Sequence, residues 1–139
     1  VGTRGAFGYA FSVKPEIALV VEGTTASDIP GTPEHMTVCA PGLGPVIPFM
    51  DGGTIYDRGL FELLRDLAEK HQIPWQTKHR VAGGTDGRTI QRSRCGVRVA
   101  GVAAAVRNIH TPSSVASLED CEEMLKLARL FIQAVAEEN

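Results

Sequence analysis

Two short, mostly apolar runs, at 17–21 and 97–106, most constrain what this 139-residue chain can fold into. The first is continuous and rich in β-branched side chains, whereas the second consists of small apolar residues and is interrupted by Gly101. Runs of this length and composition are typical of buried strands in a parallel or mixed sheet. We therefore expect both runs to be central strands.

Amphipathic helical patterns accompany these strands. Apolar residues recur at spacings of three and four between 57 and 71, where Asp57 is a suitable N-cap and Pro74 prevents continuation. A longer pattern of the same kind starts at Ser117 and predicts a C-terminal helix packed on the sheet. Strands that alternate with helices predict an α/β fold with a mixed, partly parallel sheet flanked by helices.

Weaker patterns predict three more elements. Short helices are expected at 6–13 and 86–94, and a further strand is expected at 75–81. The proline- and glycine-rich stretch 29–48 predicts a long irregular connection, and connections of that length are often functional.

Composition excludes several classes of protein. Fourteen basic residues against 16 acidic ones give a net charge of -2, so no basic surface is expected to attract nucleic acid or an anionic membrane. No apolar run approaches the roughly 20 residues that span a bilayer. Neither nucleic acid nor a membrane is therefore an expected partner.

The three cysteines indicate a reducing environment. Cys39, Cys95 and Cys121 are odd in number, are widely spaced and form no C-x-x-C pair. A disulfide framework or a cysteine zinc site is not expected, so the predicted location is the cytoplasm. Each cysteine is interpreted as a small buried hydrophobic residue.

Three places follow apolar segments, where ligands gather in α/β sheets. Glu22 comes directly after the first apolar run, and a carboxylate there is either paired or a ligand. The turn at 83–86 is either a capped strand-to-helix turn or a close approach to a ligand. His110 follows the second run and precedes Thr-Pro, so it is either a structural histidine or a metal ligand. The other histidines, His35, His71 and His79, are interpreted as surface or helix-end residues.

Four segments together resemble the glutamyl aminopeptidase family of metallopeptidases. The segments lie, in order, at 1–6 (VGTRGA), 19–31 (LVVEGTTASDIPG), 83–86 (GGTD) and 107–112 (RNIHTP). The family is also called the tetrahedral aminopeptidases, and some members carry the label cellulase M. The resemblance covers essentially the whole chain.

The resemblance implies a pair of divalent metal ions that act together in peptide hydrolysis. In the family pattern, Glu22 binds one ion and His110 binds the other. The family often has Asp where this chain has Glu22, which keeps the carboxylate and lengthens its reach. Carboxylate and imidazole ligands suit zinc, with cobalt and manganese as alternatives.

The resemblance also implies a substrate-binding role for four residues near the metal ions. These residues are Gly84, Thr85, Asp86 and Arg107. The implied partners are a peptide substrate and further copies of the chain in a homo-oligomer built from dimers.

The same resemblance implies that residues 1–139 are the C-terminal part of a catalytic domain. In the family, a Glu-Glu pair immediately precedes the Val-Gly that opens this sequence, and its first Glu is the general base. The remaining metal ligands and an inserted dimerisation domain belong to the N-terminal part. No catalytic base is therefore assigned within these residues.

Two alternatives to a peptidase remain open. The first is an incomplete domain that has no activity by itself, which a Glu-Glu pair encoded directly upstream would disfavour. The second is a glycan hydrolase, as the cellulase label suggests. Glycoside hydrolysis needs two carboxylates that flank a sugar site. The sequence gives no reason to pair Glu22 with a second acid in that way, and His110 would have no role.

Overall fold

A computed structural model describes residues 2–137. The chain begins with helix α1 (Arg4–Val13), strand β1 (Ile17–Thr25) and a single 3₁₀ turn, η1 (Glu34–Met36). Helices α2 (Arg58–Lys70) and α3 (Gly87–Ile90), strands β2 (Arg98–Arg107) and β3 (Val115–Ala116), and helix α4 (Leu118–Glu137) follow. Val1 of the 1–6 motif and the last two residues of the predicted domain lie outside the described range.

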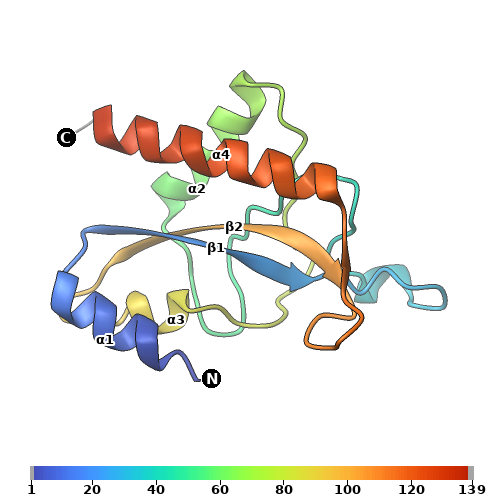
Figure 1. The fold of residues 1–139 in the computed structure, drawn as a ribbon, viewed down its shortest axis with the longest axis horizontal. Helices are drawn as coiled ribbons and strands as arrows, with labels where there is room; N and C mark the ends of the chain where they lie inside the picture. Colours follow the sequence, from blue (N-terminus) through green and yellow to red (C-terminus); the bar gives the residue numbers. More distant parts are fainter. Residues whose placement is uncertain (1, 138–139) are drawn as a thin grey trace.

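The sheet has the order β1-β2-β3 and is mixed, as predicted. Strand β1 runs parallel to β2, with Glu22 opposite Ala103, and β3 pairs antiparallel to the end of β2. Helices α2 and α4 lie on one face of the sheet, while α1 and α3 lie on the other (Figure 1). The α/β class with flanking helices is therefore confirmed.

The main apolar core lies between the sheet and helices α2 and α4. Asp57 is the N-cap of helix α2, and its carboxylate accepts a hydrogen bond from the Leu60 amide at 3.0 Å. The apolar residues at intervals of four on α2 turn towards α4 and β2, as their spacing predicts. The core comprises Ile47, Leu60, Leu64, Ala68, Ile73, Ala100, Val102, Leu127, Ala128 and Phe131.

Several helices and strands have other bounds than the sequence predicts. The predicted strand at 75–81 is wrong, because within the described residues this segment forms a single bridge, between Gln76 and Val46. The helix predicted at 86–94 is confined to α3, and β1 continues four residues beyond the predicted end at 21. The stretch 29–48 is irregular apart from η1, as expected.

The three cysteines differ in burial. Cys39 is buried, as predicted, and burial raises the pKa of its thiol to about 11. Cys95 is exposed, so its interpretation as a buried residue is wrong, and Cys121 is half-buried. Within residues 2–137, no helix combines the length and apolar character needed to cross a membrane.

Candidate functional site

Side chains alternate between the two faces of β1, and those on one face form part of the candidate site. Val20, Glu22 and Thr24 point to the face opposite the main core, where they line a cavity of about 10 Å³. Gly101 of β2 opens this face, because a Cβ there would lie 2.7 Å from Cε1 of Tyr56 and 3.0 Å from Cγ of Pro48. A residue without a side chain therefore lets the Tyr56 ring lie against the sheet.

Glu22 is a half-buried carboxylate inside β1, three residues before the strand ends. The predicted position directly after the strand is therefore wrong. Burial raises the pKa of Glu22, the positive charge of Lys78 opposes this, and the negative charges of Asp51 and Asp86 add to it. Among residues 2–137, no group donates a hydrogen bond to this carboxylate or forms an ion pair with it.

A buried hydroxyl network lies beside Glu22. The Tyr56 hydroxyl donates to Oδ2 of Asp51 at 2.8 Å and lies 3.0 Å from Oγ1 of Thr85. The other oxygen of Asp51 accepts from the amides of Gly53 and Thr54, both at 2.8 Å. Burial is the main cause that raises the pKa of Tyr56, so this group is a neutral donor at physiological pH.

The sequence prediction missed Asp51, Tyr56 and Lys78. The signals in the sequence were indirect: a glycine inside an apolar strand, and an Asp-Gly-Gly turn near an aromatic residue. Both are common in proteins, and only the fold brings them to Glu22.

The turn at 83–86 reaches the same cavity through Thr85. Gly83 has a φ of 66°, a left-handed conformation that glycine adopts without strain, and its carbonyl accepts from the Gly52 amide at 2.9 Å. Thr85 is buried, and its hydroxyl accepts from the Gly87 amide at 3.1 Å. Asp86 is the N-cap residue of α3 by position but makes no capping hydrogen bond with its side chain. Gly84 is exposed next to these residues.

Arg107, at the end of β2, has a defined partner. Its Nε lies 2.9 Å from Oδ1 of Asp28 and its Nη2 lies 2.5 Å from Oδ2. This fork lowers the pKa of Asp28 through its hydrogen bonds and charge. Asp28 lies in the segment that follows β1, so the pair fastens that loop to the end of β2.

His110 is exposed in the turn after β2, as its position in the sequence predicts. Its φ of 65° is uncommon for a residue with a side chain, and the turn is closed by the Thr111 hydroxyl, which donates to the Asn108 carbonyl at 2.7 Å. The preceding residue, Ile109, lies over β1, since a Cβ on Gly23 would be 3.8 Å from its Cδ1. The chain neighbours of Glu22 and His110 are therefore close to one another.

The predicted residues thus divide into two groups. Glu22 and Thr85 line one cavity, and the charge of Asp86 acts on Glu22. His110 and Arg107 lie beyond this cavity, at the end of β2. Residues 2–137 contain no group of three or more His, Cys, Asp or Glu side chains arranged to hold a metal ion. The described segment by itself therefore does not fit a complete metal site.

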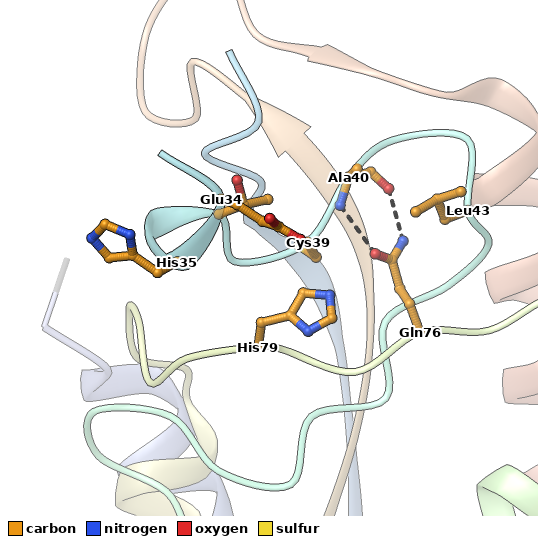
Figure 2. Close-up of a pocket in the computed structure, with 8 residues that line it drawn as sticks. Glu34, His35, Cys39, Ala40, Leu43, Gln76 and His79 are labelled. Carbon is orange, nitrogen blue, oxygen red and sulfur yellow. Dashed lines mark hydrogen bonds between the residues drawn. The ribbon is translucent and has the colours of Figure 1, made fainter. Parts of the chain in front are cut away.

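A larger pocket of about 640 Å³ opens beside this region, between η1, the loop that follows it and the segment 76–79 (Figure 2). Glu34 and His35 lie at one end, Leu43 lies at the other, and Cys39 and His79 lie between them. His35 and His79 are surface residues, as predicted, but they line a pocket that the sequence did not indicate.

Comparison with known proteins identifies similar chains. The sequence model of a family described as M42 glutamyl aminopeptidase matches residues 1–127. A protein of Acetivibrio thermocellus, described provisionally as an aminopeptidase, is 35% identical over 127 residues, which cover 91% of this chain and 38% of that protein.

Two solved structures show the same arrangement. An aminopeptidase of the archaeon Desulfurococcus kamchatkensis matches with a TM-score of 0.90 and 35% identity, over 94% of this chain and 38% of the other. The TET1 peptidase of Pyrococcus horikoshii, which can assemble into a tetrahedron or a large octahedral shell, matches with a TM-score of 0.73 and 27% identity. That match covers 92% of this chain and 36% of the peptidase. The chain thus spans little more than a third of the length of these relatives.

Proposed function

The chain belongs to the M42 glutamyl aminopeptidase family, and we propose that it takes part in removing N-terminal residues from peptides. The family match over residues 1–127 supports this assignment of reaction class. The observation that links this function to a particular residue concerns Glu22. Its carboxylate is half-buried and has no hydrogen-bond donor among residues 2–137. An unpartnered acid in such a position is costly unless something charged binds it.

The family is metal-dependent in general, which suits an unpartnered carboxylate. We propose Glu22 and His110 as the contribution of this segment to a pair of divalent ions, with zinc preferred on ligand chemistry. Such ions polarise a scissile carbonyl and lower the pKa of bound water. Because residues 2–137 hold no group of three candidate ligands, the remaining ligands and the general base would come from elsewhere in the protein.

The proposed substrate-binding residues have different support. Thr85 shares the cavity of Glu22, and Asp86 and Gly84 are its exposed neighbours, which supports a role for all three in binding a peptide end at Glu22. A substrate-binding role for Arg107 has less support, because its guanidinium forms an ion pair with Asp28. For Arg107, a role in holding the loop after β1 is the better supported one.

Three wider features of the protein follow from the family and remain proposals. Residues 1–139 are proposed as the C-terminal part of a catalytic domain, since the relatives are more than twice as long. A homo-oligomer built from dimers is proposed because a similar peptidase forms large shells. The cytoplasm is proposed as its location because of the cysteine pattern.

The direct test uses the full-length gene product. His110→Ala should lower aminopeptidase kcat/KM by about 100-fold or more and reduce the bound metal, because loss of a ligand is at least as damaging as loss of a group that orients one. The matched control is His71→Ala at the exposed end of α2, which should keep both activity and metal. Normal rate and full metal content in the His110 variant would refute the ligand role.

The alternatives make different predictions in the same assays. If residues 1–139 are an incomplete domain, this segment alone should hydrolyse no peptide even with added zinc, cobalt or manganese. Turnover by the short chain would show that the active site has been misplaced. Hydrolysis of a glucan but not of peptides by the full-length protein would favour the glycan hydrolase. Within the described residues, Asp51 is a buried acid whose charge acts on Glu22, and its carboxylate already accepts hydrogen bonds from three donors.

A further inference from the structure

The pocket of Figure 2 has two chemically different ends. Glu34 and His35, on η1, form a polar end, whereas Leu43 and Ala40 supply an apolar end. Cys39 forms part of the wall between them, and its thiol donates to the Thr25 carbonyl at 3.2 Å. A volume of about 640 Å³ is well above that of one amino-acid side chain and lies in the range of small-molecule sites.

Two chain segments connect this pocket to the cavity of Glu22. Lys78 lines the cavity, and the next residue, His79, lines the pocket. Thr25, which contacts Cys39, lies three residues after Glu22 on β1, and three residues of extended strand span about 10 Å. The pocket and the cavity of Glu22 are therefore neighbours along these two segments.

The wall at the apolar end is fixed by hydrogen bonds. The Gln76 side chain donates to the carbonyls of Ala40 at 2.8 Å and Gly44 at 2.9 Å, and accepts from the Ala40 amide at 3.0 Å. Asp120, at the start of α4, accepts from the amides of Gly42 at 2.7 Å and Gly44 at 3.0 Å. The loop that carries Leu43 is thus held on both sides.

The charge of the lining is one-sided. Among the described residues that line the pocket, Glu34 carries a formal charge at neutral pH and none is Lys or Arg, although the positive charge of Lys78 acts on Cys39 in the wall. Within residues 2–137, the Glu34 side chain has no ion-pair partner. An aliphatic stem would contact the apolar wall while a cationic head lies near this carboxylate, which is how lysine and arginine divide between apolar and polar surroundings.

We propose that this pocket receives the side chain of the N-terminal residue of the peptide and favours lysine and arginine. The proposal rests on the aminopeptidase function proposed above. It assigns Glu34 as a specificity-determining residue and Leu43 as the contact for the aliphatic stem.

The test compares aminoacyl substrates of lysine, arginine, leucine and alanine on the full-length enzyme. Glu34→Gln should lower kcat/KM for lysine and arginine about threefold to fivefold, mainly through KM, as for a solvent-exposed charge pair. The leucine and alanine substrates should be unaffected. Leu43→Trp fills the apolar end, so it should lower kcat/KM for lysine, arginine and leucine more than for alanine.

The control is Glu69→Gln, an exposed acid on α2 that does not line the pocket and should change no substrate. An equal change for all four substrates, or no change, in the Glu34 variant would overturn the specificity proposal while leaving the peptidase intact. Failure of the unmodified enzyme to hydrolyse any aminoacyl substrate would overturn the peptidase function itself, and the specificity proposal with it.

Discussion

Alternate residues of strands β1 and β2 form the two faces of the sheet, and the two faces differ in polarity. On one face Leu19, Ala100 and Val102 pack with helices α2 and α4. On the other face the strands carry Glu22, Thr24 and Gly101 beside a buried hydroxyl network. Along β1, a shift of one position moves from the apolar face to the face that carries Glu22 and Thr24, whereas β2, between its terminal arginines, supplies small or apolar residues to both faces.

The difference indicates that one face of the sheet stabilises the fold, whereas the other face holds the candidate functional residues. The apolar face excludes polar atoms and relies on complete packing, whereas the polar face depends on small residues that leave room for hydroxyls and a carboxylate. Substitutions on the two faces should therefore affect different properties, and the following experiments in the full-length protein test this separation.

Leu64→Ala should have the largest effect on stability. Its side chain is fully buried between α2, α4 and the sheet, so truncation should cost about 2–5 kcal/mol of unfolding free energy. Denaturant unfolding measures this. The control, Leu125→Ala on the exposed side of α4, should cost less than about 0.5 kcal/mol. Equal losses would mean that the core is not where the structure has it.

Tyr56→Phe should have the next largest effect, on the polar face. The variant keeps the ring against Gly101 but removes the donor to Asp51, which should cost about 1–3 kcal/mol because a buried carboxylate oxygen loses its partner. Tyr9→Phe on the exposed side of α1 is the matched control and should be neutral. A neutral Tyr56 variant would show that water replaces the hydroxyl.

Asp28→Asn should have a smaller effect that depends on pH. Arg107 lowers the pKa of Asp28, so the pair stabilises the fold above the ordinary pKa of 3.8 and this stability is lost as the pH falls through the lowered value. The variant should lose less than about 1 kcal/mol at neutral pH, because Arg107 is well exposed, and should match the unmodified protein in acid. Asp66→Asn, in an exposed pair with Arg65, should change little. A loss that persists in acid would contradict the charge explanation.

Glu22→Gln should have the smallest effect on stability, and in the opposite direction. Burial raises the pKa of Glu22, so the folded state holds this proton more tightly and stability falls as the pH rises from about 4.5 through the raised value. In metal-free protein the variant should be more stable than the unmodified protein at neutral pH and equal to it in acid. Thermal unfolding across this range measures it, and lower stability at neutral pH would show that the carboxylate has an undetected partner.

Much of the fold could be predicted because its signals are local. The leucine spacing of α2, the N-cap Asp57 and the apolar runs of β1 and β2 each act within a few residues. The strand predicted at 75–81 failed because the pattern that predicted it is local, whereas a strand also needs a partner to pair with. Among residues 2–137 its one bridge partner is Val46, and prolines at 45 and 48 remove backbone donors from that neighbouring segment.

The candidate site could be predicted less completely because its contacts are distant in sequence. The hydrogen bond between Tyr56 and Thr85 joins residues 29 positions apart, and nothing in either segment specifies the other. Glu22 and His110 were predicted as ligands from the resemblance to a family, and both roles remain predictions. The pocket of Figure 2 combines η1 with residues 76–79, a pairing that no sequence pattern indicated.

The single carboxylate of Asp120 has a consequence for how the pocket moves. Because its two oxygens hold the amides on both sides of Leu43, the pocket wall should fluctuate together with the first turn of α4. The amide hydrogens of Gly42 and Gly44 should then exchange with solvent about as slowly as those of the helix, although both lie in a loop. A peptide would meet a wall that is already ordered, so less conformational entropy would be lost on binding.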